Sequence, residues 1–182
     1  AQVASGTSTY SDTAATISTT NLSPSDGINW PPPSAKFITL DSGRLLMAGA
    51  HETSGGYTTP KTTRIWWTPP FGASDIGDAE RVPTNYWIDV EQSITGLAAM
   101  DGTVYVFAYR ALWGLAPTGL PGANAYQRYT IRTDIGCIRH QTITISDDEN
   151  GSPCVYFLSH RGPYRIGPNG VQYLGNDCED IW

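Results

Sequence analysis

Ser159 and His160 are the adjacent side chains in this sequence that come closest to a catalytic pair. A hydroxyl beside an imidazole is the beginning of a nucleophile-and-base arrangement. Successive residues of a strand point to opposite faces, however, so we expect these two side chains not to meet. His160 also aligns with Tyr109 in an internal repeat described below, which favours a packing role. The chain contains no Gly-x-Ser-x-Gly elbow and no Gly-rich phosphate loop.

Carboxyl groups offer a second kind of chemistry, because glycoside hydrolysis needs two of them facing each other across a cleft. The acids available in one part of the chain are Asp75, Asp78, Glu80, Asp89 and Glu91. The sequence alone does not show that any pair of them converges, and many acids in this sequence accompany turn-forming residues. We therefore predict no catalytic residues and no enzyme activity, and glycoside hydrolysis ranks last among three functional hypotheses.

Tryptophans could form a stacking platform for sugars. The candidate interaction residues are Trp66, Trp67, Trp87 and Trp113. Because side chains alternate along a strand, we expect one of Trp66 and Trp67 to face outward. Packing between sheets accounts for most of the other rings. A carbohydrate-binding protein is thus the second hypothesis.

Metal and cofactor sites are not indicated. The segment 147–151 is rich in oxygen ligands but lacks the ligand spacing of a calcium loop, so we interpret it as a hairpin turn. The acidic residues next to Cys178 are interpreted as lying at the solvent-exposed end of a strand. His51, His140 and His160 do not have the spacing of zinc ligands. We predict no metal and no cofactor.

The three cysteines, Cys137, Cys154 and Cys178, are odd in number and have no C-x-x-C spacing. This pattern favours buried free thiols. One disulfide with a spare thiol is the alternative.

Composition limits the classes of partner. The 182 residues carry a net charge of −6, and the 11 lysines and arginines are scattered singly, so no basic stripe for nucleic acid exists. The chain has no apolar run of the length that spans a membrane. With 19 glycines, 13 prolines and 11% aromatic residues, the sequence is typical of short strands and tight turns.

The elements that would position a functional site include a stretch that the chain contains twice. Residues 104–119 align without a gap onto residues 155–170, with five of sixteen positions identical and an offset of 51 residues. That period is typical of a four-stranded propeller blade, and a unit of this size must stack on copies of itself to bury its faces.

Short β-rich runs separated by turn signals continue this pattern along the chain. No stretch shows helical periodicity, so we predict an all-β protein. Three segments are predicted to be loops, 51–61, 71–82 and 117–124. The predicted strands are 36–40, 44–49, 63–68, 86–90, 94–100, 104–108, 126–132, 141–145, 154–158 and 171–174, with a further aromatic-bearing strand after each of the polar steps at 109–110 and 160–161.

Two regions follow from composition and pattern. Residues 1–35 form an extended Ser/Thr-rich arm with a Pro-rich end, since this composition cannot bury enough surface to fold alone. Residues 36–182 form about three four-stranded antiparallel β-propeller blades. Closed propellers have about four to eight blades, so we expect these to be part of a larger propeller or ring. Further blades beyond Trp182 or additional copies of the chain would complete it.

The sequence resembles the β-propeller region of bacteriophage tail and neck proteins, of the tail tubular, nozzle or tail-stabilisation type. The resemblance is carried by Gly136-Cys137, by the run Phe157 to Tyr164 and by the matching Val104 to Phe107. It covers about residues 37–182. Members of that group are usually much longer, so a chain of 182 residues would be a fragment or a reduced form.

The resemblance implies the first hypothesis, a structural protein of the virion. Such a protein would act in the phage tail or neck as a nozzle or tail-tube-closing ring, by protein–protein assembly and without catalysis. Its expected partners are portal, adaptor or tail components and further copies of itself, and it would be assembled in the host cytoplasm. No nucleic-acid contact is expected.

Overall fold

The computed structural model describes residues 29–30, 33–54, 57–70 and 82–176. Most of the predicted arm, the predicted 71–82 loop except Val82, and Cys178 with its neighbouring acids therefore lie outside the described residues. Within the described part the protein is all-β, as predicted. Its helices there are two 3-10 turns, η1 (Gly122–Asn124) and η2 (His140–Thr142).

Three four-stranded antiparallel sheets follow one another along the chain, which confirms the predicted number and kind of units. The first sheet contains β2 (Phe37–Asp41), β3 (Arg44–Ser54), β4 (Tyr57–Trp67) and β6 (Trp87–Asp89). The second contains β7 (Ile94–Met100), β8 (Thr103–Ala108), β9 (Leu112–Pro117) and β10 (Tyr126–Arg132). The third contains β11 (Thr144–Asp147), β12 (Pro153–Ser159), β13 (Gly162–Gly167) and β14 (Gly170–Tyr173).

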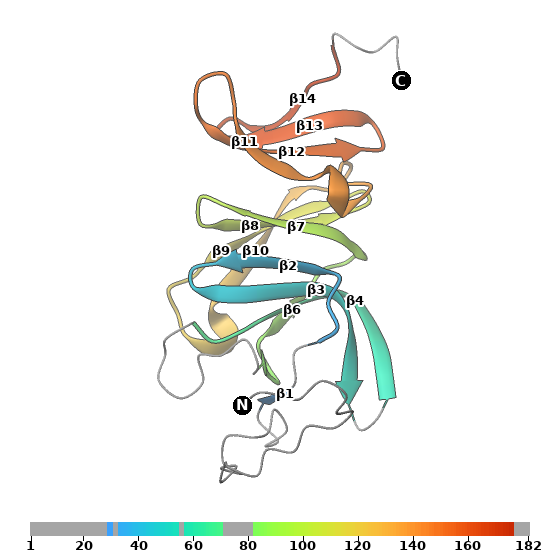
Figure 1. Ribbon diagram of the computed structural model, residues 1–182, viewed down its shortest axis with the longest axis vertical. Coiled ribbons are helices and arrows are strands. Elements are labelled where there is room, and N and C mark those ends of the chain that lie inside the picture. Colours follow the sequence, from blue (N-terminus) through green and yellow to red (C-terminus); the bar gives the residue numbers. More distant parts are fainter. Residues whose placement is uncertain (1–28, 31–32, 55–56, 71–81, 177–182) are drawn as a thin grey trace, which may run out of the picture.

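The sheets are stacked face to face in chain order, with the third at the top of Figure 1. Inside each sheet the strands are neighbours in the order in which they occur along the chain. The first strand of the second sheet, β7, contacts the first strands β2 and β11 of the sheets on either side. The first strands therefore gather on the same side of the stack.

Tight turns set the register of the first hairpin in two of the sheets. Ser42-Gly43 and Asp101-Gly102 each connect two strands, and all four residues have positive φ. Two successive positive φ values characterise the hairpin turn that matches the twist of the flanking strands, and Gly at the second position favours it. Turn signals of this kind separate the β-rich runs in the sequence, and the structure confirms turns at 41–43 and 101–102.

The two copies of the internal repeat occupy equivalent places. β8 and β9 are the second and third strands of the second sheet, and β12 and β13 are the second and third strands of the third. Apolar side chains on alternating positions fill the spaces between sheets. One cluster, which includes Leu46, Trp67 and Val106, joins the first sheet to the second, and another joins the second to the third through Phe107 and Phe157, whose ring centroids are 5.0 Å apart.

The predicted loop at 51–61 is wrong. β3 and β4 continue as a paired ribbon to Ser54 and Tyr57, and Figure 1 shows this ribbon leaving the first sheet. The register shifts between Ala48 and Ala50, where Gly49 has a φ of +66°. A bulge of this kind bends a hairpin without ending it, and the threonine-rich β4 favours extended backbone.

The first sheet also carries a short additional pair, β1 (Asn29–Trp30) with β5 (Val82–Pro83). Val82 lies against Met47 and Trp66 on the face of the first sheet that is turned away from the second. This pair was not predicted, because two-residue strands have no periodicity to detect.

Candidate functional site: a groove, two hollows and the ends of the stack

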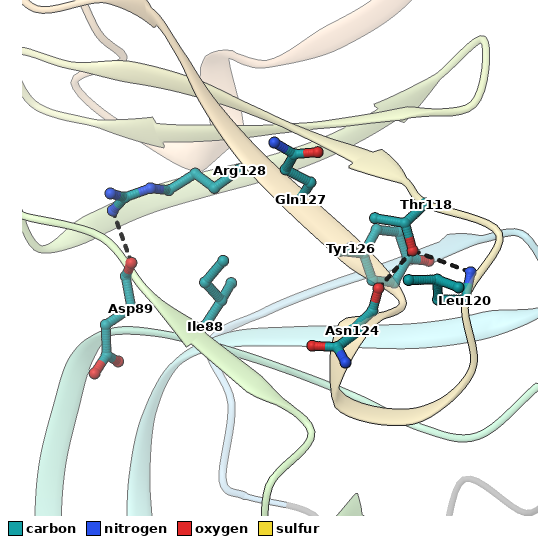
Figure 2. Close-up of a pocket in the computed structure, with 8 residues that line it drawn as sticks. All are labelled: Ile88, Asp89, Thr118, Leu120, Asn124, Tyr126, Gln127 and Arg128. Atoms are coloured by element: carbon teal, nitrogen blue, oxygen red, sulfur yellow. Dashed lines mark hydrogen bonds between the residues drawn. The ribbon is translucent and has the colours of Figure 1, made fainter.

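A groove of about 530 Å³ lies between the last strand of the first sheet and the last strand of the second (Figure 2). Ile88 and Asp89 line it from β6. The other side is formed by β10 and by the connection that precedes it, through Thr118, Leu120, Asn124, Tyr126, Gln127 and Arg128. Apolar and polar side chains alternate around it, as in many binding surfaces.

Hydrogen bonds inside the chain occupy several of the groove's polar groups. Arg128 donates to the backbone oxygen of Asp89 at 2.8 Å and pairs with Glu91 at 2.7 Å. Thr118 donates to the backbone oxygen of Asn124 and accepts from the amide of Leu120, as Figure 2 shows. These bonds hold the β9–β10 connection in place.

The carboxyl groups considered for glycoside hydrolysis do not form an acid–base pair in the described residues. Both oxygens of the Asp89 carboxylate accept from the Arg64 guanidinium, at 2.9 and 3.0 Å. Glu91 pairs with Arg128. Asp75, Asp78 and Glu80 lie outside the described residues. The two described acids are therefore each paired with an arginine and not with another carboxyl group.

The four candidate tryptophans do not share a surface. Trp66, Trp67 and Trp113 are buried, and only Trp87 reaches the surface, with 36% of its area exposed. The expectation that Trp66 or Trp67 faces outward is therefore wrong. The two rings do lie on opposite faces of β4, but Val82 covers Trp66 while the second sheet covers Trp67. The guanidinium carbon of Arg64 lies 3.5 Å from the centroid of the Trp87 ring, where it occupies one stacking face.

Ser159 and His160 do meet, contrary to the sequence expectation. The Ser159 hydroxyl and Nδ1 of His160 are 3.3 Å apart. Strand alternation does not apply because β12 ends at Ser159 and His160 belongs to the turn. His160 stacks on Tyr109, with ring centroids 5.4 Å apart, so its predicted packing role is confirmed. Among the described residues no carboxylate orients this imidazole, and Ser159 itself is buried.

The predicted hairpin turn at 147–151 is confirmed. Asp148 accepts two backbone amide bonds, from Asn150 and from Ser152, each at 2.9 Å. The Ser152 amide is the main cause of a pKa of the Asp148 carboxyl below its ordinary value. Within the described ranges no three His, Cys, Asp or Glu side chains gather as metal ligands.

Cys137 and Cys154 are buried free thiols, as the first of the two cysteine interpretations predicts. Burial raises the pKa of the Cys137 thiol above its ordinary value. Its sulfur lies 3.0 Å from the backbone oxygen of Arg139, in the segment that leads into η2. A thiol in this state is poorly nucleophilic, so Cys137 acts as a packing residue.

A hollow of about 490 Å³ lies where the first strands of the first two sheets approach η2. Lys36, Arg139 and His140 give it a basic lining, and no carboxylate lines it. The His140 ring packs on Phe37 with centroids 5.2 Å apart, and Nδ1 of His140 is buried with no hydrogen-bond partner among the described residues. A second hollow, of about 200 Å³, lies beside Ser42 and Pro117.

The two ends of the stack are the remaining candidate surfaces. Ile38 and Leu40 of β2 are 56% and 58% exposed on the first sheet, and Tyr156 and Leu158 are half-buried on the third. Sequence reasoning did not single out these residues. The signal was available in 37–40, where an apolar side chain at 37 faces one way and apolar side chains at 38 and 40 face the other.

No protein-family model matches this sequence, and a search of curated proteins also found no match. In the part of the chain that the structure describes, neither 3-10 turn has the length or apolar character needed to cross a bilayer.

Proposed function

We propose that this chain is a structural protein of a bacteriophage virion, located in the tail or neck, which acts by protein–protein assembly. In this proposal the three sheets are blades of a β-propeller, and the blades belong to a ring that forms the nozzle or closes the tail tube. The partners are portal, adaptor or tail proteins and further copies of the chain.

The observation that carries the proposal is the repeating stack of three four-stranded sheets, with apolar side chains exposed at one end and half-buried at the other. A protein built to bind a small molecule needs one well-formed concave site, but an assembly protein needs repeated, extended faces. The gathering of β2, β7 and β11 on one side of the stack supports the proposal, because the blades of a propeller place their equivalent strands around a shared axis.

The carbohydrate-binding alternative has less support. Only Trp87 of its four proposed stacking residues is at the surface, and Arg64 covers one face of that ring. The groove in Figure 2 remains the surface to which a glycan would have to bind.

Mass spectrometry of purified phage particles tests the proposed location. We expect peptides of this chain in intact particles and in isolated tails, at a constant ratio to a known tail protein. A matched preparation of empty heads without tails is the control and should lack them. Absence of the chain from intact particles, despite its presence in the infected-cell lysate, would contradict the proposal.

A further inference from the structure

Each sheet in the stack has two faces with different neighbours. We define the back face as the one that looks toward the preceding sheet along the chain, and the front face as the one that looks toward the following sheet. In the second sheet the front face includes Tyr105, Phe107 and Leu112, which pack on the third sheet. Its back face includes Val106 and Trp113, which pack on the first sheet.

The internal repeat shows which residues of the third sheet have the same positions. Its back face carries Val155, Phe157, Tyr164 and Ile166, and all four are buried, like Val104, Val106, Trp113 and Leu115 at the matching positions of the second sheet. The front faces differ. Phe107 and Leu112 are fully buried, but their counterparts Leu158 and Pro163 are only half-buried. The front face of the third sheet therefore repeats a packing surface on which no described sheet is packed.

The back face of the first sheet is also partly uncovered. Counted from the equivalent Gly43 and Gly102 turns, Ile38 and Leu40 correspond to Leu97 and Ala99 of the second sheet. Leu97 is 3% exposed because the first sheet covers it, whereas Ile38 is 56% exposed. Val82 covers the β4 side of this face at Trp66, so the open part lies along β2.

We infer that the front face of the third sheet binds the back face of the first sheet of a second copy of this chain, in a head-to-tail arrangement. The inference rests on the proposed function and names the partner surface. Within the chain, each front face is covered by the back face of the next sheet, and the front-to-back contact occurs at both internal boundaries. The front face of the third sheet and the back face of the first sheet are thus the same two kinds of face that pack together at both internal boundaries.

The charged groups on the front face do not oppose such a contact. Arg165 is opposite Tyr156 on this face, and its Nε donates to Gln172 at 2.8 Å. Its guanidinium also lies 3.8 Å from the Asp148 carboxylate. Gln172 and Asp148 hold the Arg165 side chain against its own sheet. Tyr156, Leu158 and Pro163 then form the surface that the second copy covers. Head-to-tail contacts of this kind are heterologous and generate rings or filaments.

Sedimentation velocity of the purified chain from micromolar to submillimolar concentration tests the inference. We expect species heavier than the 19.7 kDa monomer, in amounts that increase with concentration. Leu158→Glu would place a charge in the front face, and Ile38→Glu would place one in the back face. Because an unpaired charge in an apolar contact is strongly unfavourable, each change should weaken self-association at least about a hundredfold.

A mixture of the two variants distinguishes the head-to-tail contact from other dimers. The Leu158→Glu variant keeps its back face and the Ile38→Glu variant keeps its front face, so each alone should be monomeric and the mixture should form a one-to-one dimer. Tyr129→Glu is the matched control, since Tyr129 is 44% exposed on β10 of the second sheet, which is not an end sheet, and the change should leave association unchanged. Circular dichroism verifies folding, and Leu158→Gln replaces Leu158→Glu if the latter does not fold.

Three results would overturn the inference: a wild-type chain that stays monomeric over the whole range, association unaffected by either variant, or one variant that still self-associates as well as the wild type. The last would mean that two identical faces pair. None of these results bears on whether the chain is found in tails, so this experiment and particle mass spectrometry can fail separately.

Discussion

Tyr126 joins two sheets through its buried hydroxyl, which lies within hydrogen-bond distance of both the carboxylate and the backbone oxygen of Asp41. Its hydroxyl donates to Oδ2 of Asp41 at 2.9 Å, and its ring packs edge-on against Trp67 with centroids 5.4 Å apart. Asp41 closes the β2–β3 hairpin and Tyr126 begins β10, so the bond ties residues far apart along the chain. Burial, followed by the hydrogen bond to Asp41, raises the pKa of Tyr126 well above its ordinary value of 10.0.

Replacing Tyr126 with Phe should lower the free energy of unfolding by about 1–3 kcal/mol, because a buried carboxylate loses a donor while the ring contact remains. Urea denaturation at pH 7 measures the loss. Tyr129→Phe is the control, since Tyr129 is 44% exposed and its change should have little effect. A Tyr126→Phe variant as stable as the wild type would show that the hydrogen bond contributes nothing.

The same residue predicts a pH dependence. The raised pKa means that above pH 10 the unfolded chain releases the Tyr126 proton while the folded chain keeps it. The stabilisation is therefore complete below pH 10 and declines as the pH rises further. We expect the melting temperature of the wild type to fall more steeply above pH 10 than that of Tyr126→Phe, so that the two curves converge. Parallel curves would contradict the assignment.

At the scale of elements, Gly136 controls how the chain passes from the second sheet to the third. A Cβ at this position would lie 2.7 Å from the backbone oxygen of Ala111 and still closer to that of Ala108. The amide of the next residue, Cys137, donates to the same Ala108 oxygen at 2.9 Å. Only glycine permits this approach of two backbone segments.

Gly136→Ala should therefore lower the free energy of unfolding by about 2–4 kcal/mol, because backbone has to move to relieve the clash. Gly119→Ala is the control. Gly119 has a positive φ of 77°, but a Cβ added there would have no atom within 4 Å, so this change should cost only about 1 kcal/mol of backbone strain. Chemical denaturation of the two variants gives the comparison. Equal losses would mean that the close approach is not a constraint.

For the whole molecule, stability depends on contacts between sheets more than on any single sheet. Phe107 is fully buried against the third sheet, while Leu158 has the same repeat position on the third sheet and is half-buried. Phe107→Ala should lower the free energy of unfolding by about 3–5 kcal/mol, because it leaves a cavity between two sheets. Leu158→Ala should cost about 1 kcal/mol when measured at a dilution that disfavours self-association.

Thermal denaturation at low micromolar concentration tests this difference between equivalent positions. Raising the concentration should increase the apparent cost of Leu158→Ala and leave that of Phe107→Ala unchanged, since only Leu158 lies on an end face. Equal costs at both positions under dilute conditions would mean that the end of the stack is already covered within the monomer.

Local patterns were sufficient to predict most of the strands. They missed the β1–β5 pair and the continuation of β3 and β4 through 51–61, and they predicted a strand at 141–145 where a 3-10 turn precedes β11. Alternating and β-rich runs, two-residue turns containing Gly, and the repeat of 104–119 at 155–170 predict three four-stranded sheets, because these features depend on neighbours a few residues away. They also predict that the Asp148 turn is a hairpin and that His160 packs. Both are confirmed by contacts in the structure.

The features that were predicted wrongly depend on the tertiary structure. Whether Trp66 is exposed depends on Val82, which lies far along the chain, and whether Ser159 meets His160 depends on where β12 ends. The ribbon beyond Gly49 exists because two polar segments pair with each other, and composition alone does not reveal pairing. By itself the sequence determined most of the strands and how they repeat. Only the tertiary structure decided which faces those strands cover and which they leave open, because burial is a property of segments brought together from distant parts of the chain.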